Sequence, residues 1–388
     1  MDRVVTAAVL PPGPRLFRLL SEALDPSPET AGPAICPISP DLPSAALSAL
    51  LDALRPAWVE TEDGRHAYDR EPGVPVAAGT AVLIATSGST GRPKIVELSA
   101  AALRHSASAT LAHLGTGPGE RWLCCLPTSH IAGVQVLVRS LVAGTDPVIH
   151  PRFDPATVAA SGAAYLSVVP TQLRRLIDAG ADLSAFGAIL LGGAAAPPAL
   201  VESARAGGAR VITTYGMSET CGGCVYDGLP LDGVSVRVGA DGRIRLAGPV
   251  LFSGYRLQPG PTASALGDGW FVTQDLGVIE EGRLRVRGRV DDVINTGGEK
   301  VVAGEVASVL SRHPAVEEVV VVGRSDPEWG ERVTAVVVPG PDAPTLGELR
   351  AWSRASLPAH AAPRELELVA AIPLLPSGKP DLARLRSS

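Results

Sequence analysis

The strongest constraint on the fold is an alternation of short apolar runs with Ala/Leu-rich stretches, which continues to about Val225. The apolar runs predict strands, and the stretches between them predict helices. Strands that alternate with helices form a mostly parallel sheet covered by those helices. The first part of the chain is therefore predicted to be α/β. The runs that predict strands are AVLIATSG, RWLCCLP, DPVIH, YLSVVP, AILLGG and RVITTYG.

The pattern changes from about Leu231. Residues 234–248 and 276–289 contain short strand-like runs separated by Gly and Asp, which are common turn residues. Such segments predict antiparallel hairpins. We expect them to form a small sheet or a barrel-like subdomain.

A strand–helix pattern resumes after the segment GRVDDVI. Two helices and one pair of strands are predicted from the apolar periodicity of this region. The predicted helices cover residues 305–316 and 345–357, and the paired strands cover residues 317–326 and 332–340.

A chain of 388 residues is too long for one ordinary hydrophobic core. We place the boundary between two domains where the hairpin region ends. This gives a large N-terminal α/β domain at residues 1–289 and a small α+β domain at residues 290–388.

The overall charge and the apolar pattern restrict the partners. The net charge is −6, and nucleic acids and anionic membranes both favour a basic surface. The N-terminal sequence MDRVVTAAVLPPGP lacks the charge and apolar length of a secretory signal. No window approaches the roughly 20 apolar residues that a membrane helix needs. We expect a cytoplasmic protein with small-molecule partners, no nucleic acid and no membrane insertion; a homodimer is compatible with the sequence.

Five cysteines are too few and too irregularly spaced to form a disulfide framework in a chain of this length. The pair in Cys221-Gly-Gly-Cys224 has the spacing of a redox couple or of half a zinc site. No second pair follows at the spacing of a zinc finger, so we expect small residues in a pocket wall. The thiols are expected to be reduced: Cys36, Cys124, Cys125, Cys221 and Cys224.

The stretch TSGSTGRPK at residues 86–94 combines glycines, hydroxyls and one lysine directly after an apolar run. It is not a Walker A loop, because Arg92 and Pro93 separate Gly91 from Lys94. Its glycines nevertheless allow several backbone N–H groups to converge on a phosphate, and its hydroxyls donate hydrogen bonds. Taken alone, the stretch fits a surface turn between strand and helix equally well.

Five motifs in order and spacing resemble those of the adenylate-forming superfamily, which includes acyl- and aryl-CoA ligases, carrier-protein adenylation domains and luciferases. The resemblance covers the chain from about Val82 to Leu385, and the amino-terminal part is shorter than in most relatives. It implies an αβαβα arrangement of sheets in the large domain and a mobile small domain. The motifs are TSGSTGRPK, TTYGMSET, GWFVTQDLG, GRVDDVINTGGEKV and LLPSGKPDLARL.

The resemblance implies a reaction in two steps. A carboxylate attacks the α-phosphate of ATP to give an acyl-adenylate and pyrophosphate, and a thiol such as CoA then displaces AMP. Since an anion attacks a polyanion, the site must neutralise charge, and Mg²⁺ is expected with ATP. The loop over the β- and γ-phosphates would consist of Thr86, Ser87, Gly88, Ser89, Thr90, Gly91 and Lys94.

The second motif and the loop LGGAAAP are implied to hold the nucleotide. Tyr215 would stack on adenine beside Gly216 and Met217, Ser218 would contact the α-phosphate, and Glu219 would hold Mg²⁺, which prefers oxygen ligands. Without its neighbours, Glu219 would also fit a carboxylate at a helix start. The loop along the adenine and ribose would consist of Gly192, Gly193 and Ala194.

The later motifs are implied to complete the site. Asp275 would accept hydrogen bonds from the ribose hydroxyls, although the preceding Gln274 replaces the glycine usual in the family. Arg289 would contact ribose or phosphate, and Asp291 would be the pivot of the small domain. Lys379 would offset the charge that develops during adenylation. In the second step the NTGGEK loop would replace it and line the tunnel for the thiol, with Gly297, Gly298 and Lys300.

His130 in LPTSHIAGVQ matches the position where relatives place an aromatic residue or a histidine beside the incoming carboxylate; the alternative is a histidine satisfied in its own loop. The short amino-terminal part and the sequence YGMSETCGGCVYDGLPLDGV resemble those of compact o-succinylbenzoate:CoA ligases of menaquinone biosynthesis. The small pair Gly222-Gly223 would leave room for the ring. The candidates for anchoring the ring carboxylate are Ser129, Thr171, Gln172 and Arg174.

Two further functions remain open at this point. The chain could activate another aryl or fatty acid, or load a carrier protein. It could also be a nucleotide-binding module without turnover. The joint presence of Glu219, Asp275, Arg289 and Lys379 argues against the module, because a site without turnover has no physical reason to keep all four charges.

Overall fold

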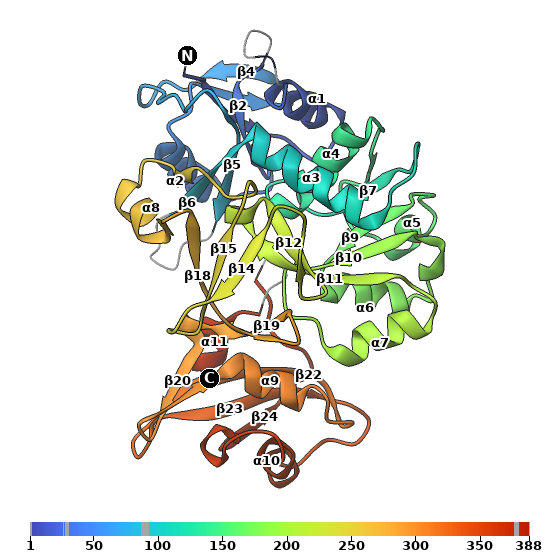
Figure 1. The fold of residues 1–388 in the computed structure, drawn as a ribbon, viewed down its shortest axis with the longest axis vertical. Coiled ribbons are helices and arrows are strands. Elements are labelled where there is room, and N and C mark those ends of the chain that lie inside the picture. Colours follow the sequence, from blue (N-terminus) through green and yellow to red (C-terminus); the bar gives the residue numbers. More distant parts are fainter. Residues whose placement is uncertain (1, 26, 28–30, 87–92, 376–379, 388) are drawn as a thin grey trace.

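The computed structural model describes residues 2–25, 27, 31–86, 93–375 and 380–387. Four sheets make up the fold (Figure 1). Three lie in the upper and middle parts of the view, and the fourth lies at the lower end with the carboxyl-terminal helices. Within the described residues no helix is long and apolar enough to span a bilayer.

The first sheet contains seven strands in the order β16-β6-β5-β2-β1-β3-β4. Its central strands β3, β1, β2 and β5 run parallel, and the strands at both ends are antiparallel. Helices α1 (Pro14–Ala23) and α2 (Ser44–Leu54) connect the first strands. The strands are β1 (Val5–Val9), β2 (Ala34–Ile38), β3 (Trp58–Thr61), β4 (Gly64–Ala67), β5 (Thr80–Thr86), β6 (Lys94–Ser99) and β16 (Gly254–Tyr255).

The second sheet also has seven strands, in the order β13-β12-β11-β10-β9-β7-β8. The five strands from β8 to β11 are parallel, which confirms the expected βα alternation. The strands are β7 (Trp122–Cys124), β8 (Val148–Ile149), β9 (Tyr165–Val168), β10 (Ala188–Leu191), β11 (Val211–Met217), β12 (Gly222–Tyr226) and β13 (Leu229–Pro230). The helices are α3 (Ala100–Leu114), α4 (Ile131–Ala143), α5 (Pro155–Ala159), α6 (Pro170–Asp178) and α7 (Pro198–Ala206).

The expectation of one mostly parallel sheet is wrong in one respect. The run AVLIATSG supplies β5, which belongs to the first sheet, whereas the five other predicted strands belong to the second. The largest apolar core joins both sheets through helices α3 and α4, where Leu103 and Leu137 are completely buried. Hydrophobic burial against two sheets thus fixes α4, the helix that begins directly after His130.

The third sheet is antiparallel throughout, which confirms the predicted hairpins. Its strand order is β14-β15-β18-β17, and β19 pairs with the other part of β18. In Figure 1 it lies between the upper sheets and the lower part of the molecule. The elements are β14 (Ser235–Val238), β15 (Arg243–Ala247), α8 (Pro259–Ala265), β17 (Leu266–Gly267), β18 (Trp270–Glu280) and β19 (Arg283–Arg289).

The fourth sheet contains the long antiparallel hairpin of β22 and β23, as predicted. The helix predicted at residues 305–316 ends earlier, at Leu310, because the residue before Pro314 disfavours helical dihedrals and Val316 already begins β22. The elements are β20 (Val293–Thr296), β21 (Glu299–Val302), α9 (Ala303–Leu310), β22 (Val316–Asp326), β23 (Gly330–Pro339), α10 (Leu346–Arg354), β24 (Glu365–Leu368) and α11 (Leu382–Ser387).

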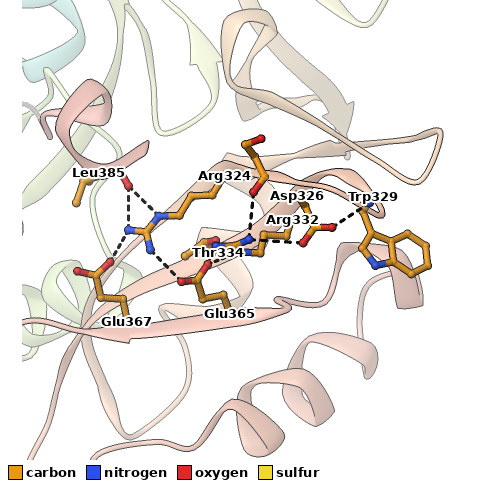
Figure 2. A network of polar contacts seen from close by, with 9 residues as sticks. Arg324, Asp326, Trp329, Arg332, Thr334, Glu365, Glu367 and Leu385 are labelled. Atoms are coloured by element: carbon orange, nitrogen blue, oxygen red, sulfur yellow. Dashed lines mark hydrogen bonds and ion pairs between the residues drawn. The ribbon is translucent and has the colours of Figure 1, made fainter. Parts of the chain in front are cut away.

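A buried arginine fastens the last helix to the fourth sheet (Figure 2). Arg324 on β22 donates from Nε to the carbonyl oxygen of Leu385 in α11 at 3.1 Å. It also forms ion pairs with Glu365 and Glu367 on β24. Because two carboxylates and a carbonyl surround it, this buried charge is well compensated. The network orders the chain that follows residue 379.

The third sheet contacts the fourth through β19 and α9. Arg287 on β19 forms a bidentate ion pair with Glu305 on α9, with distances of 2.5 and 2.6 Å. Next to it, a Cβ atom on Gly304 would lie 2.4 Å from the carbonyl oxygen of Arg287. The backbones therefore approach as closely as only glycine allows. The domain boundary at residues 289/290 stays a prediction.

This close approach predicts an asymmetry between two helical glycines. Gly304→Ala should lower the free energy of unfolding by about 1–3 kcal/mol, because the added methyl group overpacks the contact with β19. Gly347→Ala is the matched control, since Gly347 also occupies the second position of a helix and its Cβ would meet nothing closer than 3.9 Å. Denaturant unfolding measures both. Equal changes in the two variants would contradict the contact.

Candidate active site

Tyr215, Asp275 and Arg289 lie together although they come from three strands. The hydroxyl of Tyr215 on β11 donates to Oδ2 of Asp275 on β18 at 2.8 Å. Arg289, at the end of β19, donates from Nη1 to Oδ1 of the same carboxylate at 3.1 Å. Burial, followed by the charge of Asp275, raises the pKa of Tyr215, so its phenol stays a neutral donor. The structure thus brings three predicted nucleotide-binding residues to one place, and their roles stay predictions.

The backbone also fixes Asp275. Its N–H donates to Oγ1 of Thr273 at 3.0 Å, and the Thr273 hydroxyl donates to the carbonyl of Ile244 on β15 at 2.9 Å. Gln274, which replaces the glycine usual in the family, lies within β18 with its side chain exposed. Because side chains alternate across a strand, Gln274 points away from the face that carries Asp275. The substitution leaves the carboxylate in place.

Glu219 and Lys94 meet at a third residue that the sequence did not single out. The hydroxyl of Tyr255 on β16 donates to Oε1 of Glu219 at 2.9 Å. The Nζ atom of Lys94, the first residue of β6, lies over the same ring at 5.2 Å from its centroid. The predicted magnesium ligand and the lysine of the predicted phosphate loop are therefore neighbours through Tyr255.

The segment between β11 and β12 positions Ser218. A 3₁₀ turn, η2 (Ser218–Thr220), follows β11, and the N–H of Met217 donates to the Thr220 hydroxyl at 2.9 Å. A Cβ atom on Gly216 would lie 2.0 Å from the carbonyl oxygen of Gly222, so the two strands can approach only with glycine. Ser218 and Glu219 are half-buried, as side chains at a binding site are.

The predicted adenine loop lies beside the same strands. Gly192, Gly193 and Ala194 directly follow β10. A Cβ atom on Gly192 would meet Oγ1 of Thr214 on β11 at 2.4 Å, so this loop packs against the strand that carries Tyr215. His130 occupies the N-cap position of α4 and is exposed.

The remaining predicted residues lie in the fourth sheet, at the ends of the phosphate loop, or outside the described part of the chain. Gly297 and Gly298 form the turn between β20 and β21 in the fourth sheet, and Lys300 is exposed on β21. Gly297 has a φ of 60°, and a Cβ there would meet the Trp329 ring at 2.6 Å. Thr86 and Lys94 flank the phosphate loop and are joined by a 3.1 Å hydrogen bond. The other predicted residues lie outside the described part of the chain: Ser87, Gly88, Ser89, Thr90, Gly91 and Lys379.

The cysteines are inert in the described structure. All five are buried free thiols, and burial raises the pKa of Cys36, Cys124, Cys125 and Cys224 to about 12. A thiol that stays protonated is a poor nucleophile. No group of three or more His, Cys, Asp or Glu residues that could hold a metal occurs in the part of the chain described here.

Glu219 nevertheless fits the magnesium ion that accompanies ATP. Mg²⁺ in such sites binds to one or two carboxylates together with phosphate oxygens and water, so a preformed cluster is not required. The Glu219 carboxylate is half-exposed, and Tyr255 is the one described residue that hydrogen-bonds to its side chain, through Oε1. The donor is a neutral phenol, which leaves the negative charge of Glu219 for the cation.

Helix α4 carries three buried polar residues, Gln135, Arg139 and Ser140, and sequence reasoning singled out none of them for the site. Arg139 and Gln135 are one turn apart, so they share a helix face. Arg139 is 5% exposed and its guanidinium lies over the Trp122 ring, 4.8 Å from the centroid. Gln135 is completely buried and packs against Gly222 of β12. The signal in the sequence was an arginine inside an otherwise apolar helical run.

Two of the four residues predicted to anchor a second carboxylate are engaged elsewhere. The side-chain oxygen of Gln172 accepts the N–H of Val169 at 3.1 Å and so caps helix α6. Arg174 lies near Glu318 of β22. Burial raises the pKa of Glu318, and the positive charge of Arg174 offsets part of that rise. Ser129 and Thr171 are half-buried.

The contacts of Asp275 predict its contribution to nucleotide binding. Asp275→Asn should weaken AMP binding about 10- to 100-fold, because hydrogen bonds to a charged group contribute about 1.5–3 kcal/mol. Calorimetric titration with AMP measures the loss. Asp241→Asn is the control, since Asp241 also pairs with an arginine of the third sheet but is exposed and does not hydrogen-bond to Tyr215. Comparable losses in both variants would remove Asp275 from the nucleotide site.

Comparison with known proteins agrees with this geometry. The model of the AMP-binding enzyme family matches residues 25–256, and that of the AMP-binding enzyme C-terminal domain matches residues 305–379. A probable 2-succinylbenzoate–CoA ligase from Mycobacterium tuberculosis is 45% identical over 324 residues, which cover 79% of this chain and 83% of the relative. A 2-succinylbenzoate–CoA ligase from Bacillus pumilus is 33% identical, over 79% of this chain and 69% of the relative.

A solved structure has the same fold. The o-succinylbenzoate CoA synthetase from Bacillus subtilis, in complex with its acyl-adenylate intermediate, superimposes with a TM-score of 0.82. It is 26% identical in sequence, and the match covers 99% of this chain and 88% of that structure. Together with the five motifs and the grouping of Tyr215, Asp275 and Arg289, these matches show that the chain belongs to the family of AMP-binding, adenylate-forming enzymes.

Proposed function

We propose that the protein is an ATP-dependent acid–CoA ligase that converts o-succinylbenzoate to o-succinylbenzoyl-CoA, a reaction of menaquinone biosynthesis. The names of its relatives and the nucleotide-binding geometry support an AMP-forming ligase. The observation that carries the choice of a dicarboxylate is the buried, unpaired cation of Arg139. The cytoplasmic location and a homodimer stay predictions.

The reaction consists of two substitutions, the first at the α-phosphorus of ATP and the second at the acyl carbon of the adenylate. In the first, a carboxylate oxygen of the substrate bonds to the α-phosphorus of ATP while the bond to pyrophosphate breaks. In the second, the sulfur of CoA bonds to the acyl carbon and AMP leaves. Asp275 and Tyr215 would hold the adenosine, and Lys94 would offset phosphate charge. Lys379, which lies outside the described residues, keeps its predicted role in the first transfer.

Arg139 lacks the counter-charge that buried arginines normally have. Its Nη1 donates to the Ser167 hydroxyl at 3.3 Å, but its Nε has no partner and no carboxylate of the described residues pairs with it. Burial lowers its pKa, which reflects the cost of keeping this cation away from water. An uncompensated buried charge costs several kcal/mol, so an anionic group of a ligand would be strongly attracted.

Gln135 lies one turn before Arg139 on the same face of α4, nearer to His130. Neither its amide oxygen nor its amide nitrogen has a hydrogen-bond partner in the described residues. A Cβ on Gly222 would lie 3.6 Å from its Cγ, so Gln135 adjoins the strand that follows Glu219. We propose that the ring carboxylate of o-succinylbenzoate accepts hydrogen bonds from Gln135 and Arg139. The aliphatic carboxylate would then point toward His130 and the nucleotide.

The reaction itself is tested by product analysis. Protein supplied with ATP, Mg²⁺, CoA and o-succinylbenzoate should release AMP and form the thioester in equal amounts, and benzoate or a fatty acid should give far less of both. Omission of CoA should abolish the thioester. Formation of ADP in place of AMP, or activity with benzoate or fatty acids but not with o-succinylbenzoate, would contradict the proposal.

The ring-carboxylate contact is tested by substrate selectivity. Arg139→Leu should lower kcat/KM for o-succinylbenzoate by about 10- to 100-fold, as expected for a hydrogen bond to a charged group. The rate with 4-oxo-4-phenylbutanoate, which lacks the ring carboxylate, should change little. Arg175→Leu is the control, because Arg175 also lies over an aromatic ring but is exposed. A proportional loss with both acids would show that Arg139 only supports the fold.

A further inference from the structure

Tyr255 connects the two charged residues expected at the phosphates of ATP. It belongs to β16, a two-residue strand that pairs with β6 in the register Tyr255 to Val96. Lys94 is the first residue of β6, so the pairing places the Tyr255 ring next to it. The neighbouring N–H of Phe252 donates to the backbone carbonyl of Glu219 at 2.8 Å. Backbone hydrogen bonds therefore tie the segment that carries Tyr255 to Glu219 and to β6, the strand that Lys94 begins.

The side chain itself is held firmly. Tyr255 is 9% exposed and packs against the Phe252 ring, with 4.9 Å between centroids. Its N–H donates to the Thr262 hydroxyl at 2.9 Å. The hydroxyl donates to Oε1 of Glu219 at 2.9 Å. The hydroxyl therefore has a fixed position from which to orient Glu219.

Tyr255 lies between Lys94 and Glu219 and contacts both, while the two opposite charges form no ion pair with each other. An ion pair between Lys94 and Glu219 would occupy the groups that ATP and Mg²⁺ require. Instead, the ring face attracts the ammonium through a cation–π interaction of about 0.5–2 kcal/mol. The ring edge carries the hydroxyl that donates to Glu219. A weak contact of this kind is readily exchanged for phosphate oxygens when ATP binds.

We propose that Tyr255 is the positioning residue for magnesium and phosphate: its hydroxyl orients the Glu219 carboxylate toward the cation, and its ring holds Lys94 ready for the β- and γ-phosphates. The inference rests on the proposed function only in that the site binds ATP. It does not depend on which acid is activated.

Two substitutions separate the hydroxyl from the ring. Tyr255→Phe keeps the ring under Lys94 and removes the hydrogen bond to Glu219. It should raise the Mg²⁺ concentration needed for half-maximal ATP binding by about tenfold, because a hydrogen bond to a charged group contributes about 1.5–3 kcal/mol. Tyr255→Leu removes both contacts and should in addition weaken ATP binding relative to AMP binding.

Calorimetric titrations with ATP at several Mg²⁺ concentrations, and with AMP without Mg²⁺, give these constants. The AMP affinity shows whether each variant keeps its fold, since AMP lacks the β- and γ-phosphates that Lys94 is proposed to contact. Tyr165→Phe is the matched control: its hydroxyl donates to Glu120 at 2.5 Å in a comparable buried tyrosine–glutamate pair outside the site. It should leave the Mg²⁺ dependence unchanged.

The outcomes separate this inference from the proposed function. An unchanged Mg²⁺ dependence in Tyr255→Phe, with normal AMP binding, would overturn the inference and leave the ligase reaction untouched. A wild-type protein that binds ATP but does not activate o-succinylbenzoate would contradict the proposed substrate and leave the proposed role of Tyr255 intact. A wild-type protein that binds no ATP would overturn both.

Discussion

The hydrogen bond between Tyr215 and Asp275 is the contact on which the nucleotide site depends, because it joins the second sheet to the third. The second sheet supplies the Tyr215 ring, and the third sheet supplies the buried Asp275 carboxylate. Arg289 then ties the end of β19 to the same carboxylate, directly before the chain enters the fourth sheet. One carboxylate thus connects strands of the second and third sheets, next to the segment that leads into the fourth.

A second principle concerns the cations. Arg289 and Arg324 pair with carboxylates, and their charge is largely used within the protein. Lys94 and Arg139 instead lie over the rings of Tyr255 and Trp122. Aromatic rings hold a cation in place while leaving most of its charge for a ligand. Lys94 and Arg139, which we propose contact substrate anions, are both supported by rings, and rings also lie under Arg175, Arg237 and Arg364.

Those parts of the fold and of the candidate site whose residues lie in a continuous motif could be predicted from the sequence. Asp275 and Arg289 carried recognisable neighbours in their motifs. Their pairing across β18 and β19 follows a register shift between Leu276 and Gly277, which the motifs did not predict. Strands β1 to β3 were not predicted, because their core side chains include Thr, Ala, Cys and Pro as well as larger apolar residues. Tyr255 was missed because its contacts to Glu219 and Lys94 join distant segments, which only the folded sheets reveal.

Tyr215 and Asp275 are proposed to hold the adenosine, and the buried cation of Arg139 is proposed to hold the ring carboxylate of the acid. A crystal structure of the protein with a non-hydrolysable sulfamate analogue of o-succinylbenzoyl-adenylate tests these roles most directly. We expect ribose oxygens within hydrogen-bond distance of Asp275 and the ring carboxylate within hydrogen-bond distance of Arg139. A ribose elsewhere, or a ring carboxylate exposed to solvent with Arg139 still unpaired, would contradict it.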